Sequence, residues 1–245
     1  MKIIRPGVFK NFPEIIVGIS TKAGGVSPAP YFMNLSYKVG DAAENVKANR
    51  NLFFDALGIP ADRVSYQKQT HSTISKYISS PIFSDDSDAL YTNVKNNYLA
   101  VSIADCIPIL LYEPEKKIIS AVHSGWKGTC NKILTKNIMI LKKEFNIDEN
   151  FLYAYIGPGI SQKNFQVGND VAELFDEGVK IFKDEKYYVD LKKDNFLQLI
   201  SSGVKENNIE VSDLCTFENS DLLHSYRRDK DKSGRMLAII GMKNL

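Results

Sequence analysis

The chain is poor in cysteine and histidine, with three of each among its 245 residues. The cysteines are odd in number and widely spaced, which argues against a disulfide framework and favours a reducing compartment. Three imidazoles are too few for a four-copper oxidase site within one chain. They still allow one mononuclear metal site.

An excess of charge of either sign is also missing, because 31 basic residues face 29 acidic ones and the net charge is +2. This balance lacks the electrostatic footprint of a nucleic-acid-binding protein, and we expect neither a nucleic acid nor a membrane as partner. No apolar run reaches the roughly 18 residues of a membrane span. The first residues lack the features of a signal peptide, so we expect a cytoplasmic protein.

The composition that remains, 44% hydrophobic and 24% charged, is typical of a globular protein. No repeat or linker divides the chain, and we expect a single domain over residues 1–245. Strands are predicted at residues 14–20, 64–70, 88–92, 99–104, 107–112, 117–122, 151–156 and 236–241. Helices are predicted from an Asp41 cap to Leu57 and at residues 129–144, 170–176 and 191–203. The predicted fold class is α+β (mixed α/β), with layered mixed β-sheets covered by helices.

Two apolar runs in the middle of the chain end in reactive side chains, Cys106 and His123. Glu113-Pro114-Glu115-Lys116 lies between them and resembles a hairpin turn. A hairpin about this turn places Cys106 opposite His123, with β-carbons about 4.5–5.5 Å apart. A thiolate and an imidazole at that distance can share a metal ion or form a nucleophile–base pair.

His71 ends a separate predicted strand and offers a third ligand. One cysteine and two histidines suit zinc, and three protein ligands leave a fourth position for water or substrate. The loop Ser124-Gly125-Trp126-Lys127-Gly128 follows His123 directly, and its backbone N–H groups are candidates for binding an anion. The remaining histidine, His224, we expect to be a surface or capping residue.

Several motifs along the chain resemble those of one known family. They are Gln69-Thr70-His71, Ala104-Asp105-Cys106-Ile107-Pro108, His123-Ser124-Gly125-Trp126-Lys127-Gly128, Asn34-Leu35-Ser36, Asn49-Arg50 and Ser225-Tyr226-Arg227-Arg228-Asp229. The chain thereby resembles the YfiH/YlmD-like family, long labelled laccase-domain or polyphenol oxidase proteins, over nearly its whole length.

The resemblance implies a zinc-dependent purine nucleoside phosphorylase. Its members are credited with phosphorolysis of adenosine, inosine, guanosine and methylthioadenosine, and with adenosine deamination. The family's metal ligands fall on His71, Cys106 and His123. The residues expected to contact substrate are Asn34, Arg50, Ser124, Gly125 and Lys127.

The chain departs from the family pattern in a few places. A cysteine pair common in the family is replaced by Lys163-Asn164, a glutamate by Gln166, and a common arginine by Lys22. The ligand trio is intact, so the metal assignment stands, whereas these departures bear on substrate preference and rate.

We therefore expect zinc to hold phosphate or water and to lower the pKa of bound water, while Arg50 or Lys127 helps to bind phosphate. Asp105 is the candidate for orienting a ligand histidine or for proton transfer. The expected partners are purine nucleosides and phosphate, and the expected state is a monomer or weak homo-oligomer.

Three alternatives remain open at this point. They are a metal-free hydrolase with Cys106 as nucleophile and His123 as base, a copper-dependent polyphenol oxidase, and a zinc-stabilised binding module without activity. Copper is the less favoured metal because histidines are few.

Overall fold

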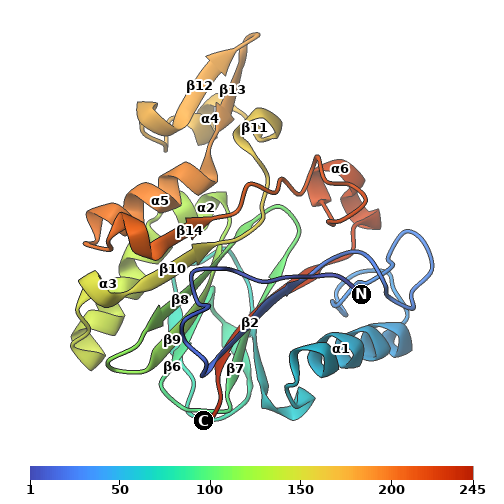
Figure 1. The fold of residues 1–245 in the computed structure, drawn as a ribbon. Helices are drawn as coiled ribbons and strands as arrows, with labels where there is room; N and C mark the ends of the chain where they lie inside the picture. Colours follow the sequence, from blue (N-terminus) through green and yellow to red (C-terminus); the bar gives the residue numbers. More distant parts are fainter. Residues whose placement is uncertain (245) are drawn as a thin grey trace.

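The computed structural model describes residues 1–244, and two six-stranded sheets form most of it (Figure 1). The first sheet runs β1 (Ile3–Ile4), β2 (Ile15–Ser20), β15 (Met236–Met242), β7 (Tyr98–Ile103), β3 (Val64–Lys68) and β5 (Phe83–Asp86). The second runs β14 (Ile209–Val211), β10 (Tyr153–Ile156), β8 (Ile107–Glu113), β9 (Ile118–Ser124), β6 (Ala89–Thr92) and β4 (Ser75–Tyr77). Each sheet combines parallel and antiparallel pairs, which confirms the predicted mixed sheets.

Helices cover the outer face of each large sheet. The α-helices are α1 (Ala43–Leu57), α2 (Trp126–Cys130), α3 (Ile133–Phe145), α4 (Asn169–Ala172), α5 (Leu191–Ser201) and α6 (Tyr226–Asp229). Short 3₁₀ helices are η1 (Ala61–Arg63), η2 (Glu149–Phe151), η3 (Gln162–Asn164), η4 (Glu177–Val179), η5 (Glu206–Asn208) and η6 (Lys230–Lys232). No helix among residues 1–244 is both long and apolar enough to span a membrane.

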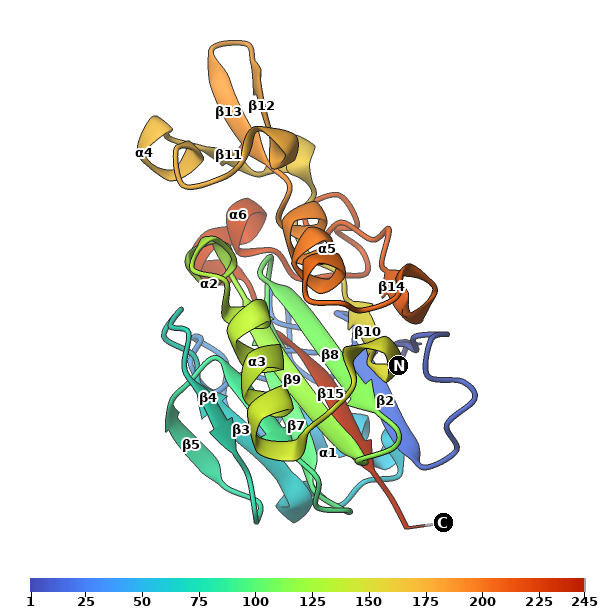
Figure 2. The same cartoon turned by 90° about the vertical axis from the view of Figure 1, so that its left-hand side faces the viewer.

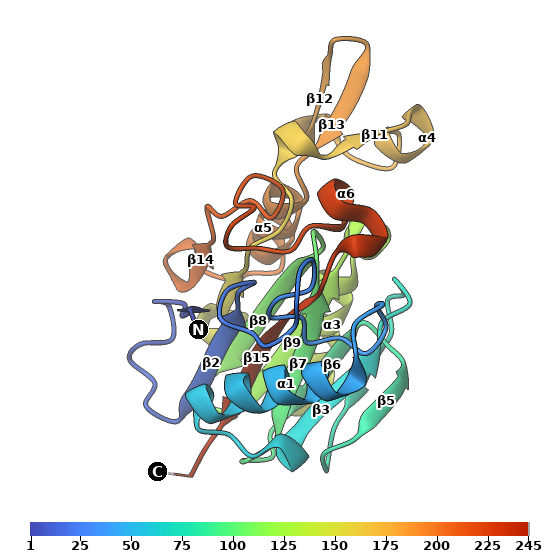
Figure 3. The ribbon, with the colours of Figure 1, turned by 90° about the vertical axis from the view of Figure 1, so that its right-hand side faces the viewer.

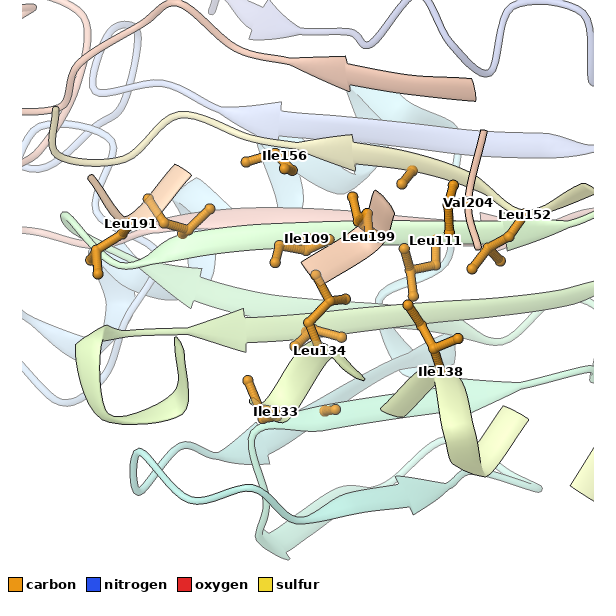
Figure 4. Packing of buried hydrophobic residues seen from close by; sticks show 14 of the residues in the cluster. Ile109, Leu111, Ile133, Leu134, Ile138, Leu152, Ile156, Leu191, Leu199 and Val204 are labelled. Carbon is orange, nitrogen blue, oxygen red and sulfur yellow. The ribbon is translucent and has the colours of Figure 1, made fainter. Parts of the chain in front are cut away.

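The hydrophobic core is divided into three layers by the two sheets. Phe53, Phe54 and Leu57 of α1 pack on the outer face of the first sheet. A second layer fills the space between the sheets, where Val101 of β7 and Ala121 of β9 meet. In the third layer α3 and α5 pack on the outer face of the second sheet; Figure 4 shows Leu134 and Leu199 there beside Ile109 and Leu111.

The central hairpin of β8 and β9 is buried on both faces. Every residue of the two strands is buried, and alternate side chains of β8 point to the inter-sheet layer and to the helices. Burial on both faces explains the unbroken apolar runs that precede His123 and follow Cys106.

Two helix predictions need correction. Asp41 does not cap α1, because Ala42 is the N-cap residue and the Asp41 carboxylate accepts hydrogen bonds from Ser27 and Asn34 instead. The single helix predicted for residues 129–144 is two helices, α2 and α3, because Lys132 adopts a left-handed conformation with φ 61° that ends the first and begins the second.

The sequence analysis missed a small third sheet. It is antiparallel, made of β11 (Gln166–Val167), β13 (Lys186–Val189) and β12 (Lys180–Lys183), and projects away from the two large sheets (Figures 1, 2 and 3). Strands of two to four residues with exposed side chains carry little apolar alternation, so the sequence pattern gave no signal there.

Candidate metal centre and its cavity

Three predicted ligands converge at the end of the large sheets. His71 follows β3 of the first sheet, Cys106 precedes β8 of the second, and His123 lies in β9. One ligand atom from each lies within 4.8 Å of the others. Sγ of Cys106 is 3.8 Å from Nε2 of His71, and the two imidazole rings are 5.0 Å apart and inclined by 73°. The group could therefore hold one metal ion.

The hairpin register differs from the predicted one. His123 pairs with Pro108, and Ser124 with Ile107, so Cys106 is a diagonal neighbour of His123 rather than its direct partner. The turn causes the difference, because it comprises residues 114–117, one position later than predicted, with Lys117 at φ 53°. A shift of two positions keeps both side chains on the same face of the sheet, so the convergence survives.

Asp88, which the sequence analysis missed, orients two of the three ligands. Its Oδ1 lies 2.8 Å from Nδ1 of His123 and accepts a 3.1 Å hydrogen bond from the backbone N–H of His71. Its Oδ2 accepts from the N–H of Ser72 at 2.6 Å and from the Ser72 hydroxyl at 2.7 Å. The carboxylate thus places the proton of His123 on Nδ1 and leaves Nε2 for a ligand role. The sequence analysis placed Asp88 at the start of the strand predicted at residues 88–92, and an aspartate at a strand end gives no signal of this role in sequence.

The charges of the group favour a thiolate. Burial opposes ionisation of Cys106, but the charge of His123 and hydrogen bonds from both imidazoles outweigh it and lower the pKa of the thiol to about 6. Burial likewise opposes a charge on Asp88, yet hydrogen bonds from His123 and Ser72 lower its pKa to about 2. The thiolate is the form of cysteine that binds metals.

Gly125 lies against the ligands and leaves no room for a side chain. A Cβ at this position would lie 2.7 Å from Cδ2 of His71 and 2.9 Å from Sγ of Cys106. Gly125 is the N-cap residue of α2, a helix of only five residues. Close packing against the ligand trio therefore explains why position 125 is a glycine.

Asp105 makes different contacts from those expected. Its carboxylate accepts hydrogen bonds of 2.6 Å from the hydroxyl of Thr216 and 2.6 Å from the N–H of Arg227. Neither ligand histidine is oriented by it, and Asp88 fills that role. Asp105 has φ 97°, a left-handed conformation that is costly for a residue with a side chain and that turns the chain into Cys106.

The ligand trio opens into a cavity of about 880 Å³. Of the predicted site residues, Arg50, His71, Asp105, Cys106 and His123 line it. The cavity also has an aromatic lining that the sequence analysis did not identify. Its members are Tyr37, Tyr66, Phe83, Trp126, Phe165 and Tyr226.

Four predicted substrate residues do not line the cavity. Ser124 is buried, with its hydroxyl bonded to Thr129 and Asn195. Lys127 is exposed and lies over the ring of Trp126. Gly125 packs behind the ligands, as described above.

Asn34, the fourth, is a structural residue behind the cavity wall. Its side-chain amide donates to Asp41, and its Oδ1 accepts a 2.9 Å hydrogen bond from the N–H of Arg235. Asn34 thereby fixes the start of β15, where Arg235 reaches the cavity.

The departures from the family pattern also lie outside the cavity lining. Lys163 forms a 2.6 Å ion pair with Glu218, and the Asn164 amide lies 3.5 Å from Sγ of Cys215. Lys22 donates to the carbonyl of Ser220, and the carbonyl of Gln166 accepts from Arg227. These residues stabilise loops around the cavity.

His224 is neither a surface nor a capping residue. It is fully buried, and neither ring nitrogen has a hydrogen-bond partner among residues 1–244. Burial lowers the pKa of its imidazole to about 3. Its Nε2 lies so close to Gly234 that a Cβ there would be 2.6 Å away, which places the ring directly behind the segment carrying Arg235.

The fold and the site together define a class of protein: two packed mixed sheets with a His–Cys–His group that could hold a metal ion and that lines a cavity. The model of a family described as multi-copper polyphenol oxidoreductase laccase matches residues 16–243. The chain belongs to this family.

Relatives and solved structures agree with this assignment. The chain is 32% identical to purine nucleoside phosphorylase YlmD of Bacillus subtilis, over 96% of this chain and 91% of the relative. It is 35% identical to a purine nucleoside phosphorylase of Haemophilus influenzae, over 94% and 96% of the two chains. The crystal structure of YlmD from Geobacillus stearothermophilus superposes with a TM-score of 0.91 at 28% identity, over 100% and 97% of the two chains.

Proposed function

We propose that this protein is a zinc-dependent purine nucleoside phosphorylase that converts adenosine, inosine, guanosine or methylthioadenosine and phosphate to the free base and a ribose 1-phosphate. The observation that carries the proposal is the convergence of His71, Cys106 and His123 at a cavity that is also lined by arginines. The names of relatives that are 32–35% identical support the reaction.

The residues present fit zinc. One thiolate and two imidazoles form a ligand set with an open fourth position, which is typical of catalytic zinc sites. Asp88 gives His123 the carboxylate partner that such ligands have, and Gly125 allows the close approach of the others. When bound, the ion would act as a Lewis acid beside the reacting phosphate or water.

Arginines next to the trio would bind the phosphate. The backbone N–H of Arg227 donates to Asp105, the residue before Cys106, and Arg227 and Arg235 line the same cavity as the ligand trio. Arg50 or Lys127 was expected in this role from the sequence. Lys127 lies outside the cavity lining, whereas Arg50 lines it together with Arg227 and Arg235. A guanidinium that binds phosphate at two oxygens holds it in line with the sugar.

The reaction breaks the bond between C1′ and the purine nitrogen and forms a bond between C1′ and a phosphate oxygen. The departing base keeps the electron pair and takes up a proton. The aromatic side chains of the cavity provide faces for stacking the purine and shield the sugar from water. A role of Asp105 in proton transfer stays a prediction.

We extend the proposal to adenosine deamination at the same site. Water in place of phosphate would attack C6 of adenine, form the C6–O bond, and release the amino group as ammonia. The cavity, which holds several times the volume of a water molecule, admits either reactant.

The proposal is tested on one preparation by elemental analysis and by product analysis with each nucleoside and phosphate. We expect stoichiometric zinc, release of base and ribose 1-phosphate, and loss of at least about 100-fold in turnover in Cys106→Ala, because a three-ligand site cannot spare its thiolate. Cys130→Ala is the matched control, since Cys130 is a free, half-buried cysteine outside the cavity lining.

The alternatives give different results. Full activity in metal-free protein that is lost on thiol alkylation would identify a Cys106–His123 hydrolase, and copper with oxidation of phenols would identify a polyphenol oxidase. Bound zinc without conversion of any nucleoside, or unchanged turnover in Cys106→Ala, would contradict the proposal and favour a binding module.

A further inference from the structure

One acidic side chain lines the cavity in which phosphate is proposed to bind. Asp105 is the only acid in the lining among residues 1–244, and five lysine and arginine side chains line the cavity with it. A carboxylate in such a place repels an anionic ligand, so its presence needs a compensating gain. The contacts of Asp105 indicate what this gain is.

Both carboxylate oxygens of Asp105 hold segments that lie far away in the sequence. Oδ1 accepts the hydrogen bond from the hydroxyl of Thr216, and Oδ2 accepts the one from the backbone N–H of Arg227, each at 2.6 Å. Thr216 is fully buried, so water offers its hydroxyl no alternative partner. The carboxylate therefore connects the loop before Cys106 to residues 111 and 122 positions further along the chain.

Arg228 joins the two segments that Asp105 holds. Its Nη1 donates to the carbonyls of Thr216 and Phe217, each at 2.8 Å, and its Nη2 lies 2.7 Å from Oδ2 of Asp229. The guanidinium of Arg228 is thus occupied within the protein, and it makes α6 and the segment of Thr216 a single unit. Asp105 links this unit to the loop of the metal ligand.

The neighbouring Arg227 keeps its charge available for a ligand. Its Nη1 donates to the carbonyl of Gln166 at 3.0 Å, and its guanidinium lies 5.1 Å from the centre of the Phe165 ring. Its side chain forms no ion pair with an acid within residues 1–244. A carbonyl oxygen and an aromatic ring orient a guanidinium without neutralising it.

The backbone of Asp105 forms the other end of the link. Its φ of 97° is a conformation that residues with a side chain disfavour and that persists only where surrounding contacts impose it. Its carbonyl accepts a 2.9 Å hydrogen bond from the N–H of Ile160. The next residue is Cys106, so the backbone of Asp105 sets the direction in which the chain enters this ligand while the carboxylate holds α6.

We propose that Asp105 is a positioning residue that fixes the phosphate-binding guanidinium of Arg227 relative to the metal ligand Cys106. This inference rests on the proposed function, because it takes Arg227 as a ligand of phosphate. A phosphate that binds beside the trio and at an arginine together gains most when the two are held at a fixed separation. That preorganisation outweighs the repulsion from one carboxylate.

The test is calorimetric titration of zinc-loaded protein with inorganic phosphate, in wild type and in two variants that both remove the negative charge. Asp105→Asn can keep both contacts, because its amide oxygen accepts from the N–H of Arg227 while its NH₂ group donates to the Thr216 hydroxyl. Asp105→Gly keeps the backbone conformation, which glycine adopts freely, and loses both contacts. We expect phosphate affinity no more than about threefold below wild type in Asp105→Asn and at least about tenfold below it in Asp105→Gly.

A double-mutant cycle separates positioning from a general loosening of the fold. Arg227→Gln removes the guanidinium and keeps the backbone N–H. If Asp105 acts by placing Arg227, Asp105→Gly costs less than about threefold in phosphate affinity in the Arg227→Gln background. A general loosening would cost the same factor in both backgrounds.

Asp184→Gly is the matched control. Asp184 also has a positive φ, 50°, but it is exposed in the turn between β12 and β13 and does not line the cavity. Its replacement should leave phosphate affinity unchanged. If thermal unfolding shows that Asp105→Gly does not fold, Thr216→Val takes its place, since it removes one of the two contacts and should lower phosphate affinity severalfold.

Equal phosphate affinity in Asp105→Asn and Asp105→Gly overturns the inference, as does an equal factor in both backgrounds of the cycle or wild-type affinity in Thr216→Val. Zinc-loaded wild type that binds no phosphate overturns it as well. The expected pattern of phosphate affinities in a protein that converts no nucleoside refutes the proposed function alone.

Discussion

Two buried titratable side chains, Asp88 and His224, lie behind two different parts of the cavity wall and are held there in different ways. Asp88 supports the wall that carries His71 and His123: its Oδ1 contacts both of these residues, and its Oδ2 accepts hydrogen bonds from the backbone and side chain of Ser72. His224 lies behind the wall that carries Arg235, and its ring has no partner among residues 1–244. Hydrogen bonds to Asp88 therefore fix the first wall, which carries His71 and His123. The second wall, which carries Arg235, is held by packing around the neutral ring of His224.

The largest effect is expected from a substitution that removes the hydrogen bonds of the first wall. Asp88→Asn should lower zinc affinity by about 10–100-fold, because the amide cannot accept all the N–H groups that the carboxylate accepts and no longer fixes the His123 tautomer. The measurement is zinc competition with a chromogenic chelator. Asp86→Asn, which affects an exposed ion pair with Lys68, is the control. An Asp88→Asn protein that holds zinc within twofold of wild type would remove Asp88 from this role.

A substitution at Gly125 tests the packing of the same wall and should have a smaller effect on zinc affinity. Gly125→Ala should weaken zinc binding on the order of tenfold, since its Cβ would push against Cδ2 of His71 and Sγ of Cys106. Gly178→Ala should change nothing, because no atom lies within 4 Å of the Cβ added there. Both are measured by chelator competition together with thermal unfolding. Normal zinc affinity in Gly125→Ala would show that the ligands adjust freely.

A further prediction concerns the second wall and the response of the folded protein to acid. The pKa of His224 is about 3 in the folded protein and about 6.5 in an unfolded chain, so the unfolded state takes up the proton first as pH falls. Stability is complete above pH 6.5 and is lost progressively towards pH 3. Between pH 7 and pH 5 the loss from this group is about 2 kcal/mol.

His224→Leu removes this titration. Denaturant unfolding at the two pH values should therefore give the variant a shallower pH dependence than wild type. Identical slopes for the two proteins would show that the His224 ring is protonated in the folded state or reaches water.

Sequence patterns predicted the longer strands of the two large sheets and the three side chains that converge, because both leave strong local signals. The long apolar runs that follow Cys106 and precede His123 marked β8 and β9 and the reactive side chains at their ends. The helix break at Lys132 was missed, because a left-handed lysine has no pattern in sequence. The expectation of one domain over residues 1–245 stays a prediction.

The cavity wall was harder to predict because its residues come from separate segments. Arg227 and Arg235 belong to a run of mixed charge that looks solvated in sequence. Only the three-dimensional structure shows that both line the cavity, while Asp229 pairs with Arg228. Asp88 was predicted only as the first residue of a strand, and its hydrogen bonds with Thr70, His71, Ser72 and His123 are visible only in the structure. Asn34 and Ser124 were expected to contact substrate from their motifs, whereas both are occupied by internal hydrogen bonds.

The ligand trio draws its members from different sheets. His71 follows a strand of the first sheet, whereas Cys106 and His123 flank strands of the second. An ion held by all three would act as a cross-link between the halves of the sandwich, and only a chain whose sheets have already docked can offer the complete set. Metal at about 100 times its dissociation constant would then add about 2.7 kcal/mol to the free energy of unfolding, so cellular zinc supply would influence how long the folded chain survives.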